Sequence, residues 1–365
     1  MFCCPQLTRT LCLLPPSLCL AVIFCWTAQS RPATHSPNFA GSERCATCHS
    51  EIASVQLRSD HALSVRQLKD VPQFIQALPL HFTDSANLVE YRFQRSGDRV
   101  VLMTVRGQDT AEIELLWAFG AGRKALTFVG KTKAGIYGQV RVSWYSASND
   151  LDITPGSKAT IKDAADALAD WFEPAKREEC FACHVSRQAD QLPEEISPKS
   201  VGIQCERCHG PGDQHIQAIT DDKVEQGLAI RHPGRLGDRE QYEFCGECHR
   251  RPPADFDSEA IDKIIQDKVS IRYPARRLIL SRCYTEGNGG LKCTLCHNAH
   301  QQLAVSPADY DSKCLSCHAP PGSGKSPCPV ARNGCATCHM PREWLTKHLE
   351  FADHWIRVVR ATRPK

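Results

Sequence analysis

Seven segments of the sequence share one arrangement of reactive residues, Cys-x-x-Cys-His. Two cysteines three positions apart lie on one side of a short turn, so both thiols can form thioethers with the two vinyl groups of a single haem. The histidine that follows can then reach the iron from one face. Chance predicts about 0.05 such segments in a chain of this composition, so the pattern indicates seven covalently attached haem c groups. The cysteines are Cys45, Cys48, Cys180, Cys183, Cys205, Cys208, Cys245, Cys248, Cys293, Cys296, Cys314, Cys317, Cys335 and Cys338, and the iron-binding histidines are His49, His184, His209, His249, His297, His318 and His339.

Other uses of paired cysteines fit this arrangement less well. Structural zinc sites do not require a histidine directly after every second cysteine, and a thiol redox motif needs a single pair. A disulfide scaffold is a further alternative for an exported chain, but all except two of the cysteines after residue 30 lie in the motifs. We expect the remaining two, Cys283 and Cys328, to form a disulfide in an oxidising compartment.

The histidines outside the motifs decide what the irons can do. A second imidazole makes an iron six-coordinate and low-spin, which suits electron transfer, whereas an empty position makes a catalytic site. His300 cannot share an iron with His297, because residues three apart project the same way, so we expect it to serve a neighbouring haem. His215 follows a tight Gly-Pro-Gly bend. Together with His61 and His354, both expected in helices, these are the predicted second ligands.

For the other four histidines the sequence is less informative. His81, His232 and His348 stay open as ligands, and His35 is not expected to bind iron.

The spacing of the motifs divides the chain unevenly. After the motif at 45–49 no further motif occurs before residue 180, and six then follow up to residue 339. So few residues cannot enclose each macrocycle separately, and aromatic residues are only 7% of the chain. We therefore expect the haems to pack against one another and to form much of the core.

The long gap after the first motif has the pattern of a β-rich segment. Residues 88–106 alternate Val89, Tyr91 and Phe93, then have a Ser-Gly-Asp turn and a β-branched run, which predicts a hairpin. Residues 113–117, 125–129 and 139–145 predict further strands, and an apolar stripe over 157–172 predicts a helix.

The expected fold class is therefore a mostly α and irregular multihaem cytochrome c with a haem-packed core and a small β-rich insertion. The predicted regions are a signal peptide at 1–30, a first haem segment at 31–84, the β-rich insertion at 85–150, a helical connector at 151–178, a six-haem domain at 179–356 and a tail at 357–365.

The first thirty residues resemble a secretory signal. Arg9 precedes the apolar stretch 11–28, and small residues follow it. The stretch is short for a membrane span and contains Pro15 and Pro16, so we expect an exported, periplasmic protein without a transmembrane segment after signal removal. The formal net charge is +3, to which haem propionates would add negative charge, so nothing indicates nucleic acid as a partner.

Several segments around the motifs resemble those of a family of bacterial multihaem c-type cytochromes. This broad group contains the tetrahaem electron acceptor of hydroxylamine oxidoreductase. By that likeness His61, His215, His300 and His354 would be distal haem ligands. The segments are 203–212 with His215, 293–300, 335–341 with 353–355, and 41–45 with 59–61.

Three functions follow as expectations. The first is electron transfer along about seven closely packed, mostly bis-histidine haems between a redox protein donor and acceptor, with no catalytic residue. The alternative is a multihaem oxidoreductase acting on a small nitrogen or sulfur compound at one open haem. Relatives that reduce nitrite have lysine in place of a motif histidine, and here all seven motifs end in histidine. A third alternative is a subunit of a membrane complex, docked through the β-rich insertion.

Overall fold

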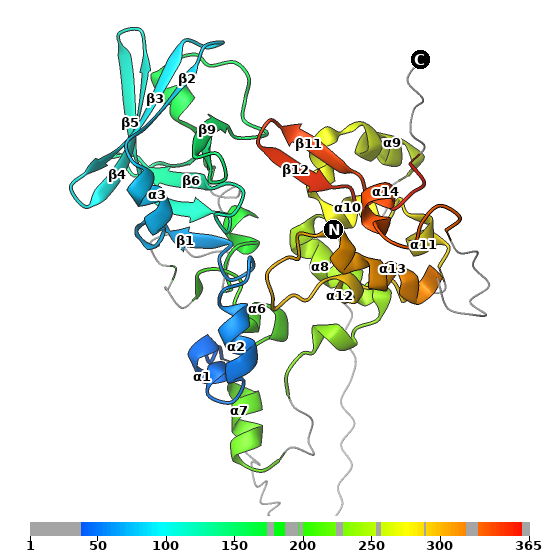
Figure 1. The fold of residues 1–365 in the computed structure, drawn as a ribbon. Helices are drawn as coiled ribbons and strands as arrows, with labels where there is room; N and C mark the ends of the chain where they lie inside the picture. The colour runs from blue at the N-terminus through cyan, green and yellow to red at the C-terminus, as the bar shows by residue number, and fades with distance from the viewer. Residues whose placement is uncertain are drawn as a thin grey trace, which may run out of the picture. The chain divides into compact units, whose positions relative to one another are not determined.

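The computed structural model describes residues 38–173, 179–186, 196, 200–223, 229–252, 257–287, 290–318 and 328–359. Strands dominate the first half of these residues and short helices the second (Figure 1). The expected signal peptide at 1–30, the tail beyond residue 359 and His35 lie outside the described residues.

An eight-stranded antiparallel sheet forms the β-rich part. Its strand order is β10-β7-β6-β5-β4-β3-β2, and β1 pairs with the end of β5. A separate hairpin joins β8 and β9. The strands are β1 (Val65–Gln67), β2 (Leu80–Asp84), β3 (Val89–Ser96), β4 (Arg99–Arg106), β5 (Asp109–Phe119), β6 (Thr127–Lys131), β7 (Tyr137–Val140), β8 (Val142–Tyr145), β9 (Asp150–Ile153) and β10 (Ala169–Trp171).

The predicted hairpin at 88–106 is present as β3 and β4. Its turn is made at Gly97, whose φ of 63° is open to glycine at little cost. Val89, Tyr91 and Phe93 all point to one face and are fully buried, as a period of two requires. The hairpin was predictable because both its turn and its alternation are local properties of the sequence.

Aromatic side chains gather in the core of this sheet. Phe74, on α3 (Pro72–Ala77), packs on Phe128 with ring centroids 4.5 Å apart, and on Phe93 and Trp144. The sheet therefore has a conventional apolar core of its own, although the whole chain contains few aromatic residues.

Two expectations about this region were wrong. The sheet is larger than a small insertion, because its strands run from Val65 to Trp171. The helix expected over 157–172 is only α4 (Ala164–Leu168), which Asp163 caps through the backbone N–H of Asp166. The chain then continues as β10, because pairing with β7 gives Ala169–Trp171 backbone hydrogen-bond partners. The apolar stripe in the sequence gives no sign of that pairing.

Short helices carry most of the Cys-x-x-Cys-His motifs. The helices described outside the sheet region, with or without a motif, are α1 (Ser42–Ala46), α2 (Ser50–Gln56), α6 (Cys205–His209), α7 (Asp213–Thr220), α8 (Asp238–His249), α9 (Ser258–Gln266), α10 (Pro274–Leu278), α11 (Arg282–Thr285), α12 (Cys293–Cys296), α13 (Asp311–His318) and α14 (Cys335–His339). The single turns are η1 (Leu68–Asp70), η5 (Pro233–Arg235), η6 (Lys268–Arg272) and η7 (Pro307–Tyr310), and the strands β11 (Arg342–Thr346) and β12 (Leu349–Ala352) form a hairpin.

Two of the predicted ligand histidines lie outside helices. His61 is in a turn after α2, and His354 follows β12 in a segment without regular secondary structure. The prediction that both residues lie in helices was wrong. Within the described ranges, no helix combines the length and apolar character needed to cross a bilayer.

Candidate haem-binding sites

Several histidines have one ring nitrogen occupied by a backbone carbonyl. A metal-bound histidine usually donates its second ring nitrogen in this way, which selects the tautomer and orients the ring. With the proton on Nδ1, each of these rings donates to its carbonyl and keeps Nε2 for an iron. The Nδ1–O distances are 3.2 Å for His61 to Ala299, 3.1 Å for His184 to Ser64, 2.9 Å for His209 to Arg231, 3.0 Å for His339 to Arg357 and 3.2 Å for His354 to Ala352.

Four motif histidines each face a histidine from another part of the chain. A metal–imidazole bond of about 2.0–2.1 Å puts the ring centroids of a bis-imidazole metal roughly 6.3 Å apart. The centroid distances are 6.4 Å for His49 and His215, 6.0 Å for His249 and His61, 5.9 Å for His209 and His300, and 6.2 Å for His297 and His354. The centroid spacing of all four histidines predicted as second ligands thus matches the spacing that two imidazoles on one iron would have.

His354 is positioned by a buried ionic network. Asp353, which is fully buried, accepts two hydrogen bonds from Arg277, at 2.8 and 2.7 Å, and one from Arg357 at 2.6 Å. Burial lowers the pKa of His354 to about 4, with the nearby His297 as a further cause. The His354 ring is therefore neutral at physiological pH, which is the form that binds iron.

The histidines left open by the sequence have different surroundings. His232 also lies 6.3 Å from His209, with the two rings at 89°, so its spacing makes it a candidate for the same iron as His300, whose ring is 5.9 Å away and within 6° of parallel. His348 stacks on Tyr145 at 4.5 Å, and its Nε2 is 3.3 Å from the Asp150 carboxylate.

His81 lies away from the motifs. It is exposed on β2, where it pairs with Arg92 of β3. Among the described residues, no histidine ring contacts His184, His318 or His339.

Cysteines of different motifs are neighbours. In the haem-bearing protein these sulfurs would be thioether sulfurs at the edges of two haems. The thiols of Cys45 and Cys205, of Cys183 and Cys248, and of Cys245 and Cys293 lie close enough to shift each other's pKa values, and Cys314 likewise acts on the pKa of Cys335. The motifs are therefore packed against one another, as their density in the sequence predicted.

Buried donors without partners test whether these residues suit haem. The Nε groups of Arg207 and Arg276 are buried and have no hydrogen-bond partner. Haem carries two propionates, and guanidinium groups pair well with carboxylates. Together with the histidine pairs, these donors fit a set of haem groups. In the described part of the chain, no three histidine, cysteine or acidic side chains gather as they would around a bare metal ion.

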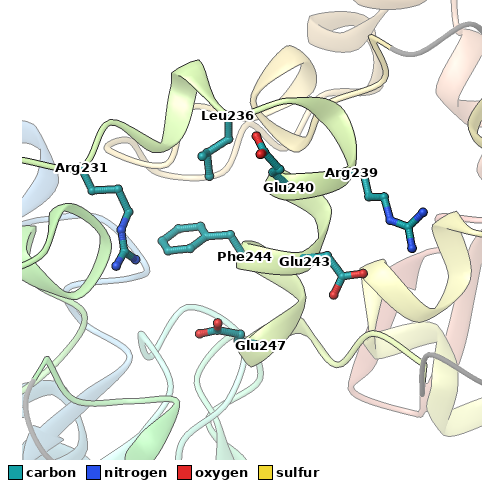
Figure 2. A pocket seen from close by; sticks show the side chains of 7 residues that line it. All are labelled: Arg231, Leu236, Arg239, Glu240, Glu243, Phe244 and Glu247. Atoms are coloured by element: carbon teal, nitrogen blue, oxygen red, sulfur yellow. The ribbon is translucent and has the colours of Figure 1, made fainter.

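A pocket of about 500 Å³ lies on the outer face of α8 (Figure 2). Arg231 points over the ring of Phe244, at 5.4 Å from its centroid, and the carbonyl of Arg231 is the partner of His209. The pocket therefore adjoins the third motif, and beside the ring of Phe244 it carries two guanidinium groups and three carboxylates. Its lining residues are Arg231, Leu236, Arg239, Glu240, Glu243, Phe244 and Glu247.

The expected disulfide is absent. Cys283 and Cys328 are not bonded to each other in the described structure, and Cys328 is exposed. The electrostatic neighbours of Cys283 are Cys296 and Cys314, so it lies beside the fifth and sixth motifs instead.

Sequence reasoning overlooked the two residues between the cysteines of the third motif. Glu206 is buried and binds three backbone N–H groups, and Arg207 reaches the carbonyl of Ala182 in the second motif and the sulfur of Cys248 in the fourth. The sequence did contain one signal for their role: two opposite charges stand side by side inside a motif that must pack closely against other motifs.

Comparisons with known proteins find similarity to multihaem cytochromes. The family described as cytochrome c554 and c-prime matches residues 144–210, which include the second and third motifs. The multihaem cytochrome MtrA of Shewanella baltica (strain OS185) is 23% identical over 218 residues, which cover 55% of this chain and 56% of that protein. The chain thus spans about half the length of this curated relative.

A solved structure resembles the fold. The outer cell wall cytochrome OcwA matches 88% of this chain and 80% of its own, with a TM-score of 0.51 and 18% sequence identity.

Proposed function

Because the chain is similar in sequence and in fold to multihaem c-type cytochromes, we propose that it is an electron carrier. It holds seven haems at its seven motifs, works outside the cytoplasm in the periplasm, and passes electrons one at a time between a redox protein donor and acceptor. Its relationship to the group of the tetrahaem electron acceptor of hydroxylamine oxidoreductase is part of this proposal.

The observation that carries the proposal is the set of four facing histidine pairs. Each pair would occupy both axial positions of an iron, and an iron held this way is low-spin and has no site for substrate. Haem, when bound, supplies the one-electron chemistry; the histidines hold each iron and the carbonyls behind them fix the ring orientation.

The cysteine neighbours supply an order for electron transfer. The first motif is next to the third, through Cys45 and Cys205, and the third to the fourth, through Arg207 and Cys248. The fourth, fifth, sixth and seventh motifs then follow one another. Because Cys183 is next to Cys248 and Arg207 also reaches the carbonyl of Ala182, the second motif branches from the junction of the third and fourth. We infer a linear path of six haems with one side branch.

A second candidate function has a specific observation in its favour. No histidine ring faces His184 among the described residues; its ring contacts that of Phe119 instead, at 5.0 Å. Within the described residues no imidazole lies opposite His184, as is also true of His318 and His339, but only His184 has an aromatic ring in contact with it that would keep the site apolar. The branch haem could then be the open site of an oxidoreductase for a small nitrogen or sulfur compound, with the other haems as its wire.

Electron paramagnetic resonance of the oxidised holoprotein, with haem counted as the pyridine adduct, tests both functions. The carrier proposal expects seven haems and low-spin ferric signals from at least the four paired irons. A count well below seven, or low-spin intensity from fewer than four haems, would contradict it. A high-spin signal that changes when nitric oxide or cyanide is added would favour the oxidoreductase function over the carrier function.

A further inference from the structure

A buried carboxylate lies inside the third motif. Glu206, between Cys205 and Cys208 on α6, is only 6% exposed. Its Oε1 accepts hydrogen bonds from the backbone N–H groups of Ala40 at 2.7 Å and Gly212 at 2.8 Å, and its Oε2 accepts one from Gly41 at 2.8 Å. A carboxylate can remain buried when several donors satisfy it in this way.

These three N–H groups belong to two segments that carry ligand histidines. Gly41 directly precedes α1, the helix that opens the first motif and leads to His49. Gly212 directly precedes α7, which carries His215. The rings of His49 and His215 face each other with centroids 6.4 Å apart. The Glu206 side chain thus binds the backbone just before α1, which leads to His49, and just before α7, which carries His215.

The surrounding contacts support the same junction. α1 lies beside α6 (Figure 1). The backbone N–H of Asn38 donates to Asp213 at 2.7 Å, and the hydroxyl of Ser42 donates to Gln204 at 3.2 Å. The Asn38–Asp213 contact is exposed and Ser42–Gln204 is a single longer bond, whereas Glu206 makes three short bonds, so the buried carboxylate should be the strongest of the links.

We propose that Glu206 is a positioning residue that holds His49 and His215 on a common axis, for the haem attached at Cys45 and Cys48. This inference rests on the proposed haem ligation. The three hydrogen bonds of the Glu206 carboxylate go to backbone N–H groups, so it acts through the backbone. Without the carboxylate, the starts of α1 and α7 lose their shared anchor, and three backbone N–H groups lose their acceptor. His215 then moves from the second face of that iron.

The test compares variants of the haem-loaded full chain by electron paramagnetic resonance and pyridine haem count. His215→Ala should convert about one haem from low-spin to high-spin, and Glu206→Ala should convert the same haem without loss of haem. Glu206→Gln keeps an amide oxygen for Ala40 and Gly212, so it should give a smaller high-spin fraction. Glu51→Ala is the matched control, because this glutamate lies on α2 just after the first motif but is exposed.

The double variant identifies the haem that Glu206 controls. If both residues act on one iron, Glu206→Ala combined with His215→Ala gives no more high-spin haem than His215→Ala alone. An additive increase, or a fully low-spin Glu206→Ala protein, overturns the inference. If Glu206→Ala does not accumulate, a Glu206→Gln protein with unchanged spin states overturns it as well. An unchanged spectrum for His215→Ala instead refutes the ligand assignment of the proposed function.

Discussion

Substituting Asp353 by alanine should both destabilise the protein and disturb one haem. Asp353 is fully buried, and Arg277, which it pairs with, is only 4% exposed. Arg277 donates to the carboxylate through two nitrogens, and Arg357 donates through a third. Removing the carboxylate leaves a buried guanidinium without its partner, which costs about 3–5 kcal/mol of unfolding free energy.

The haem effect follows from the position of Asp353 in the chain. It directly precedes His354, whose ring faces His297 at 6.2 Å. Without the Arg277 anchor, His354 should leave the iron of the haem at Cys293 and Cys296. We therefore expect about one low-spin haem to become high-spin in the Asp353→Ala protein.

Urea unfolding followed by far-ultraviolet circular dichroism gives the stability change, and electron paramagnetic resonance gives the spin state. The matched control is Glu286→Ala, which removes an exposed carboxylate from its pair with Arg282 and should alter neither quantity. A loss below about 1 kcal/mol for Asp353→Ala would show that Arg277 is not left as an unpaired buried charge. Unchanged low-spin intensity would show that this network does not position His354.

Three further predictions concern other charges and ligands. His300→Ala should make the haem at Cys205 and Cys208 high-spin while haem stays attached at the fifth motif; an unaltered spectrum would mean that His300 does not bind that iron. Arg207→Gln removes a permanent positive charge between the second and fourth motifs, so a redox titration should show a haem potential lower by roughly 70 mV, for a unit charge at about 10 Å and an effective dielectric constant of about 20. Arg207→Lys should keep most of that potential, and equal shifts in both variants would argue against a charge effect. Burial would raise the pKa of Asp84 and of Asp353, but hydrogen bonds from arginine hold both below their usual range. This stability is present above about pH 4 and lost as the pH falls through the folded-state pKa values, so the urea midpoint should drop in acid; a midpoint that is level from pH 7 to pH 3 would contradict the assignment.

Local patterns in the sequence predicted the local parts of the fold. The β3–β4 hairpin was foreseeable because its turn at Gly97 and its alternating apolar residues lie within twenty positions of each other. The size of the sheet was not foreseeable, because β10 pairs with β7, which lies about thirty residues earlier in the chain. An apolar stripe such as 157–172 fits a helix as well as a buried strand, and only the neighbour decides between them.

Cysteine spacing by itself determined the attachment chemistry, because both thioethers and the first iron ligand come from five consecutive residues. Composition also indicated which histidines were available as second ligands. Only the tertiary structure decided which of them meets which motif: His215 lies opposite His49, and His354 opposite His297. It also revealed Glu206, an ordinary charged residue in the sequence, as the acceptor for three backbone groups. Such pairings depend on contacts between distant segments, and no local pattern of residues encodes them.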